Sequence, residues 1–210
     1  MLVKDLIERP SLVLIIDAWN DRDTEQYRRC LTNIKNFCET SPHVAAIGLA
    51  SYLSTESWLF SQEEPWYSQS KEFFYDRLRW ETLRQVWHDA EFTDDIATHS
   101  IVSNIAIRSD QRQFLLWHNL QVLYYCNHIN TSIENIYVVG TAWEECLRFR
   151  SVGYRELSSL NNFNLFSKQK TILSRKDCVL AVGDLPVSDV DYPWQELDGT
   201  TVKLDELYGG

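Results

Sequence analysis

The stretch SLVLIID, residues 11 to 17, is a continuous apolar run that ends in an acid. A run without alternating polar residues is typical of a strand buried on both faces, as the strands of parallel sheets are. The apolar residues that follow have helical spacing and predict a helix over 23 to 40, with Asp23 or Thr24 as its N-cap. A second apolar run, HVAAIGLASY at 43 to 52, predicts another strand. A strand, a helix and a strand in this order indicate a right-handed crossover in a parallel sheet.

The same alternation continues toward the C-terminus. We predict strands over 98 to 108, 133 to 140 and 176 to 185, and helices over 70 to 91, 111 to 130 and 142 to 152. The stretch 154 to 173 has room for another short strand and a helix, and the tail from 189 is expected to wrap the surface. We therefore predict one α/β domain over 1 to 210, with a mainly parallel sheet flanked by helices and an aromatic-rich insertion at about 53 to 92.

Composition excludes several functional classes. The net charge is −10 and no block of lysine or arginine stands out, which disfavours binding to nucleic acid or to an anionic membrane surface. No apolar run approaches the roughly 20 residues of a membrane span, and the charged start is unlike a secretory signal. The five cysteines form no CxxC pair, so we expect a reducing, cytoplasmic setting without a disulfide framework.

Cofactor motifs are missing from the sequence. The five histidines show no ligand spacing with acids or thiols, so no metal site is predicted. Glycine is scarce, with seven residues, and neither a GxGxxG motif nor a P-loop occurs. We therefore expect no bound cofactor.

Three side chains that could carry chemistry follow predicted strands. Asp17 ends the first strand, Arg108 ends the strand predicted over 98 to 108, and Cys146 lies in the first turn of a predicted helix. In open parallel sheets, ligands bind outside the carboxyl ends of the strands. Each residue also has a structural interpretation: the aspartate as a turn former or N-cap, the cysteine as a core residue and the arginine as a surface ion-pair partner.

Taken together, the three segments resemble the isochorismatase-like cysteine hydrolases over roughly residues 11 to 153. LIIDAWND resembles their DxQND signature, and VVGTAWEEC is similar to their GxxTxxC turn, with Trp143 where threonine is usual. The stretch IRSDQRQF lines up with KxxxSAF, so that Arg108 takes the place of the lysine and Phe114 follows six residues later. The Gly153-Tyr154 pair arrives earlier than in the family.

The resemblance implies a triad of Asp, Lys and Cys. Asp17 would be the general base, Cys146 the nucleophile that attacks an amide or similar carbonyl carbon, and backbone N–H groups the oxyanion hole. Arg108 would keep a positive charge near the thiol, but a guanidinium cannot give up a proton and could instead pair with Asp17. Three hypotheses stay open: a degenerate site with a binding or assembly role, an active hydrolase of a small C–N substrate, and an α/β protein that resembles the family by chance.

The segment STESWLFSQEEPWYSQS, 54 to 70, places Trp58, Phe60, Trp66 and Tyr67 among acids and serines. Trp and Tyr are enriched at interfaces, so this segment is predicted to be a lid over a pocket or a contact between subunits. Isochorismatase-like proteins commonly self-associate. We therefore expect a homo-oligomer with a small-molecule ligand, and no nucleic acid or membrane partner.

Overall fold

The central strand β1, Ser11–Ile16, is buried along its whole length. It runs parallel to β2, Val44–Ala50, on one side and to β4, Asn135–Thr141, on the other. An apolar run flanked on both sides in this way loses little hydrogen bonding on burial, because its backbone groups pair with two neighbours. The predicted buried parallel strand at the start of the chain is confirmed.

The computed structural model describes only part of the chain. The described residues are 7–16, 24–50, 105–106, 108–116, 119–141, 143, 147–148, 152–187, 195–197 and 200–204. The predicted helix over 70 to 91 and the aromatic segment lie outside them. Among the described residues, no helix is long and apolar enough to cross a membrane.

Helix α2, Glu25–Thr40, connects β1 to β2. Thr24 caps it, because its Oγ1 accepts a hydrogen bond of 3.1 Å from the amide of Tyr27. Its buried residues are Tyr27, Cys30, Leu31, Ile34, Phe37 and Cys38, which is the set that the helical spacing predicts. The helix packs with these side chains against one face of the sheet.

The sheet has the order β3-β2-β1-β4-β5-β8-β7, and β6 also pairs with β4. Its remaining strands are β3 (Arg112–Leu116), β5 (Thr171–Arg175), β6 (Val179–Leu180), β7 (Gln195–Leu197) and β8 (Thr200–Leu204). Strands β1 to β6 pair in parallel, whereas β8 is antiparallel to both β5 and β7. The predicted mainly parallel α/β arrangement is confirmed.

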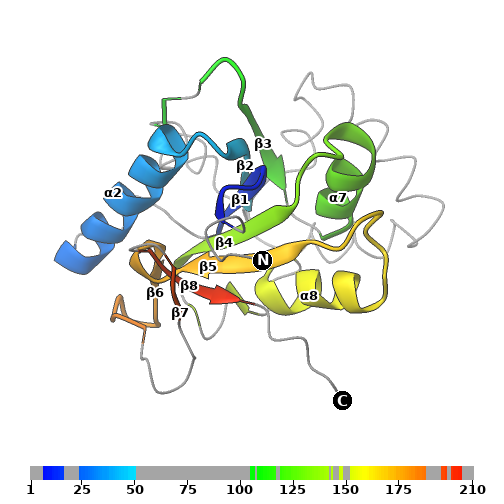
Figure 1. Ribbon diagram of the computed structural model, residues 1–210. Coiled ribbons are helices and arrows are strands. Elements are labelled where there is room, and N and C mark those ends of the chain that lie inside the picture. The colour runs from blue at the N-terminus through cyan, green and yellow to red at the C-terminus, as the bar shows by residue number, and fades with distance from the viewer. Residues whose placement is uncertain are drawn as a thin grey trace, which may run out of the picture.

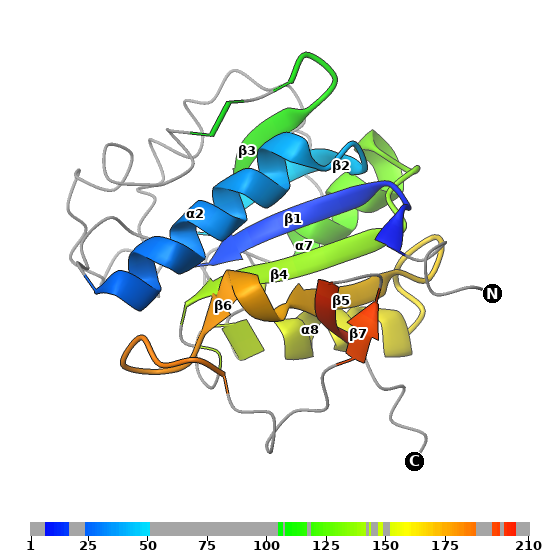
Figure 2. The same ribbon diagram turned by 60° about the vertical axis from the view of Figure 1, so that its left-hand side comes forward.

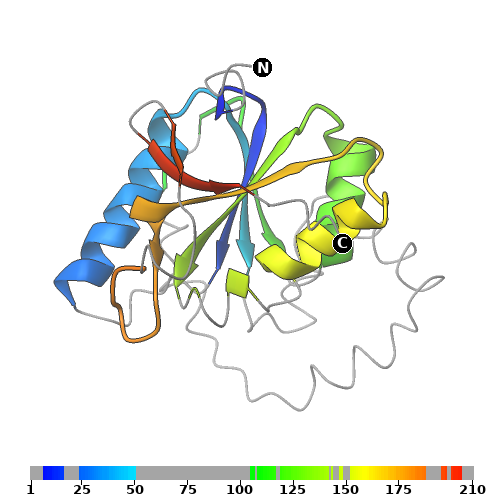
Figure 3. The same ribbon diagram turned by 60° about the horizontal axis from the view of Figure 1, so that its bottom comes forward.

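Helices cover both faces of the sheet. Figure 1 and Figure 3 show α2 on one face, and α7 (Asn119–Tyr124) and α8 (Tyr154–Asn162) on the other. A short π-helical turn, Tyr125–Ile129, continues α7. The sheet and both helical layers share one core, to which α2, β1 and β4 contribute more buried side chains than any other single element does among the described residues.

Three predicted elements differ from the structure. The strand predicted over 98 to 108 is wrong at its end, because residues 105, 106 and 108 are in no strand, and residues 98 to 104 lie outside the described residues. The next strand, β3, lies later, at 112 to 116, inside the predicted helix 111 to 130. The predicted strand 176 to 185 is wrong over most of its length: β5 ends at Arg175, and only Val179–Leu180 pair afterwards. The tail contributes β7 and β8 to the sheet instead of only wrapping the surface. A short apolar run is compatible with a strand or with a helix, and the strands available for pairing determine which of the two forms.

Candidate functional site at the carboxyl edge of the sheet

The carboxyl ends of β1 and β4 meet at an unusually close contact. Ile16 is in register with Gly140, and Gly140 has φ +126°. A Cβ on Gly140 would overlap the carbonyl oxygen of Ile16, so a side chain does not fit there. Because L-residues also rarely adopt this backbone conformation, two independent constraints require glycine at this position.

The two predicted reactive residues follow these strands in sequence. Asp17 comes directly after Ile16, and Cys146 comes six residues after Gly140. Both lie outside the described residues, so their separation and contacts stay a prediction. The structure does bring together the two strands that lead to them, side by side and in parallel (Figure 2).

Trp143 fills the core below this edge. It is fully buried and packs edge-to-face on Tyr154, with ring centroids 5.9 Å apart. It also stands where the resemblance expects a threonine. A buried indole that packs on another aromatic ring contributes apolar area and ring contacts. Trp143 is therefore a core residue of this chain, three residues before Cys146 in the sequence.

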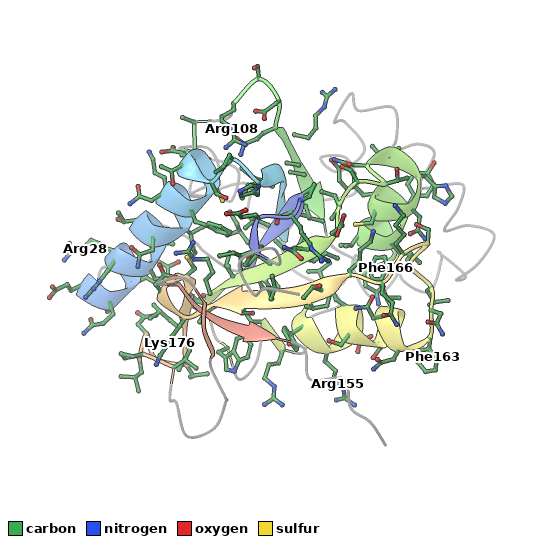
Figure 4. The ribbon with its side chains drawn as sticks, viewed as in Figure 1. Arg28, Arg108, Arg155, Phe163, Phe166 and Lys176 are labelled. Atoms are coloured by element: carbon green, nitrogen blue, oxygen red, sulfur yellow. The ribbon has the colours of Figure 1, made fainter. Side chains whose placement is uncertain are left out.

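Arg108 lies at the opposite, amino edge of the sheet. Its guanidinium donates hydrogen bonds to the carbonyl oxygens of Ser41, at 2.8 Å, and Val44, at 2.9 Å. Longer bonds of 3.5 and 3.4 Å reach the carbonyls of Glu39 and Pro42. Figure 4 shows Arg108 at the end of α2 that is far from Arg28. The guanidinium thus satisfies acceptors that the end of α2 and the turn into β2 leave without helix partners.

This placement keeps Arg108 away from the carboxyl edge. Val44 pairs with Ser11, the first residue of β1, whereas Asp17 follows Ile16, the last one. Five steps of about 3.3 Å along a strand separate these levels by about 16 Å. The expectation that Arg108 pairs with an acid holds, but the acid is the exposed Asp110, 3.1 Å from its Nε.

Gln111 completes the structure around Arg108. Its buried amide nitrogen donates to the carbonyls of Cys38 and Val44, both at 2.9 Å, and its oxygen accepts from the amide of Arg108 at 3.0 Å. We call this group, Arg108 and Gln111 with the carbonyls that they bind, the amino-edge anchor. It holds the start of β3 against the turn between α2 and β2.

The sequence analysis did not single out Asp184. This residue lies in a turn over 181–185, which begins directly after β6 and is closed by a 2.8 Å bond from the amide of Ala181 to the carbonyl of Leu185. Asp184 is only 7% exposed and has φ +61°. Its Oδ2 accepts a 3.1 Å hydrogen bond from Oγ1 of Thr24. The Gly-Asp pair after an apolar run is a turn signal that could have drawn attention to it.

The described thiols are all buried. Burial raises the pKa of Cys30, Cys38 and Cys126 to about 12 in each case. The pKa of Cys178 is also raised well above its ordinary value, first by burial and then by the nearby carboxylate of Asp177. Since the thiolate is the nucleophile, these side chains are inert near neutral pH. Cys146, the remaining one of the five cysteines, lies outside the described residues.

Metal chemistry finds no support in the described part of the chain. No group of three His, Cys, Asp or Glu side chains there could hold a metal ion. His128 is exposed and lies against the ring of Tyr124, with centroids 4.9 Å apart.

Comparisons with protein-family models, with curated proteins and with solved structures found no match to this chain.

Proposed function

We propose that the chain is a divergent isochorismatase-like protein with a degenerate site, which binds a ligand or a partner at the carboxyl edge without hydrolysing it. Asp17 and Cys146 would line this edge. The position of a ligand outside the carboxyl ends of parallel strands suits the general behaviour of such sheets.

The observation that carries the proposal is the location of Arg108. It was the candidate for the cationic member of the triad, and its guanidinium is committed to backbone carbonyls at the amino edge. A thiol at the carboxyl edge would then lack the help in ionising that Arg108 was expected to give. Trp143, buried where the family has threonine, supports the same conclusion.

Thiol titration is the direct test. The other four cysteines are buried with raised pKa values, so alkylation of the native protein near neutral pH reports on Cys146. We expect iodoacetamide to modify Cys146 with the pH dependence of an ordinary thiol, half-maximal near pH about 8.5. Peptide mapping identifies the modified residue. Half-maximal labelling below about pH 6.5 would contradict the degenerate site.

An active cysteine hydrolase is the second candidate. The contact of Ile16 with Gly140 favours this candidate, because it joins β1 and β4, and Asp17 and Cys146 follow these two adjacent strands in the sequence. An active enzyme should hydrolyse a member of a panel of small amides, and both Asp17→Asn and Cys146→Ser should abolish that activity. Absence of turnover across the panel, together with an ordinary thiol titration, favours the binding or assembly role.

A further inference from the structure

Exposed apolar side chains gather on two neighbouring segments at the amino edge of the sheet. Ile129 ends the π-helical turn before β4 and is 41% exposed, whereas Phe163 and Leu165, between α8 and β5, are 75% and 48% exposed. Asn127 ties the two segments together, because its side-chain nitrogen donates to the carbonyl of Leu165 at 3.0 Å and its oxygen accepts from the amide of Ser167 at 2.8 Å. We call Ile129, Phe163 and Leu165 the Phe163 patch.

Hydrogen bonds fix the segment after α8 in the conformation that exposes the patch. Asn164 has φ +52°, and its amide donates to the carbonyl of Asn161 at 2.9 Å. The amide of Leu165 donates to the carbonyl of Leu160 at the same distance. Both bonds belong to the Schellman pattern that ends many helices, in which the residue at the position of Leu165 usually packs on its own helix. A surface that is already fixed loses little conformational entropy when it binds a partner.

The same segment both buries and exposes aromatic side chains. Phe166 is only 5% exposed, whereas Phe163 is 75% exposed. Figure 4 shows Phe166 between α7 and α8, and Phe163 at the end of α8. A single exposed apolar residue needs no explanation, but apolar side chains that gather on a fixed surface mark an interaction site.

The two segments that carry the Phe163 patch contain no acid. Residues 119–133 and 157–170 include neither Asp nor Glu, although the whole chain contains 30 and has a net charge of −10. Lys168 is exposed within the second segment. The acids that flank the segments are Glu134, which pairs with Arg9 at 3.1 Å, and Glu156, in the first turn of α8. The electrostatic complement of this surface is therefore a carboxylate next to an apolar side chain.

The chain itself contains this complement. Carboxylates stand beside aromatic or aliphatic side chains in EEPWY, at 63 to 67, and in LDELY, at 204 to 208. Two copies with a net charge of −10 each repel one another, so a surface without acids is where a second copy approaches at the lowest electrostatic cost.

We propose that the Phe163 patch binds a second copy of this chain, with Lys168 facing carboxylates of that copy. The two surfaces in contact differ, so the contact is heterologous. The inference is independent of the proposed ligand site, because the patch lies at the start of β4 and β5 and the proposed site lies at the opposite edge of the sheet.

Two variants separate the apolar and the charged contribution to this contact. Phe163→Ser removes the most exposed side chain of the patch, and Lys168→Glu reverses the charge beside it. The matched controls are Leu185→Ser, in the turn after β6 and 62% exposed, and Arg29→Glu, exposed on α2 at the other face of the sheet. Substitutions of exposed side chains change stability little, so we expect all four variants to fold, which circular dichroism checks.

Sedimentation velocity over a range of protein concentrations measures the self-association. We expect the wild type to associate, and its apparent dissociation constant to rise by about tenfold or more in Phe163→Ser and in Lys168→Glu. The serine loses the central apolar contact, and the glutamate places a like charge opposite the carboxylates of the second copy. Leu185→Ser and Arg29→Glu should match the wild type.

Each outcome decides for or against the contact between copies. A wild type that stays monomeric at every concentration overturns the proposal, and so does a dissociation constant that Phe163→Ser and Lys168→Glu leave unchanged. Equal weakening in either control variant also overturns it. Monomeric protein that sediments with phosphatidylcholine vesicles, and no longer does so as Phe163→Ser, would assign the patch to a membrane surface instead. Weakening confined to Phe163→Ser and Lys168→Glu supports the proposal.

Discussion

At the scale of the single residue, Gly140 is the most constrained position at the carboxyl edge. Gly140→Ala would force a Cβ onto the carbonyl oxygen of Ile16 in a backbone conformation with φ +126°. We expect the free energy of unfolding to fall by about 3 kcal/mol or more, because overlap and backbone strain add. Urea-induced unfolding followed by tryptophan fluorescence measures it.

Gly183 offers the matched control for that substitution. It also has a positive φ, of 76°, but a Cβ there would meet nothing within 4 Å. Gly183→Ala should therefore cost only about 1 to 2 kcal/mol from the backbone conformation. Equal losses in the two variants would show that the contact with Ile16 contributes nothing.

Cys126 makes stability depend on pH. Burial raises its pKa from 9.0 to about 12, so the folded protein keeps a proton that the unfolded chain releases above pH about 9. Its stabilising contribution is complete below that pH and is lost as the pH rises toward 12. In Cys126→Ala, the fall in unfolding free energy between about pH 9 and about pH 10.5 should be shallower by up to about 1.4 kcal/mol per pH unit.

The comparison with Cys126→Ala does not depend on absolute stability. The substitution itself removes a buried side chain and lowers stability at every pH. Only the difference in slope isolates the thiol, because Tyr137 and the other buried thiols titrate in both proteins. Parallel slopes in chemical denaturation at several pH values would contradict the raised pKa.

At the scale of elements, the amino-edge anchor joins β3 to the turn between α2 and β2. Arg108→Lys should lower the free energy of unfolding by about 1 to 2 kcal/mol, because one ammonium group cannot bind the carbonyls of Ser41 and Val44 with the planar fork of arginine. It should give no gain of amide hydrolysis, since Arg108 lies at the edge opposite to the end of β1, after which Asp17 follows in sequence. Urea unfolding and the amide panel check both parts.

Asp110→Asn is the control for the anchor. This aspartate pairs with Arg108, but its side chain is 68% exposed, and exposed ion pairs contribute little. Its loss should change the unfolding free energy by less than about 1 kcal/mol. A larger loss than in Arg108→Lys would mean that the ion pair, not the carbonyl contacts, holds the turn.

The elements predicted correctly have strong local patterns. β1 and β4 are continuous apolar runs, and α2 has an apolar stripe together with a cap. β3 was missed because Phe114 and its apolar neighbours form a short run whose state depends on pairing with β2. Arg108 is predicted at the carboxyl edge but lies at the amino edge, because the spacing of residues alone does not tell where a strand ends. The contact of Asp184 with Thr24 spans most of the chain and has no local signal.

At the scale of the whole molecule, self-association stays a prediction. It depends on the aromatic segment with Trp58, Phe60, Trp66 and Tyr67, which lies outside the described residues. Changing Trp58 and Trp66 to Ser should lower the oligomeric mass in light scattering if the segment is a subunit contact, because Trp residues often dominate interfaces. An unchanged mass with an unchanged melting temperature would show that the segment neither joins subunits nor covers a pocket.

The strand order also has a consequence for synthesis on the ribosome. β1, α2 and β2 are consecutive and form a local unit, whereas β4, which pairs with the other side of β1, is made much later. Until β4 emerges, the nascent chain carries an unpaired apolar edge of the kind that pairs with other chains. A pause in translation between β2 and β4 should therefore favour aggregation, and a chaperone that binds extended apolar segments should protect the chain during that interval.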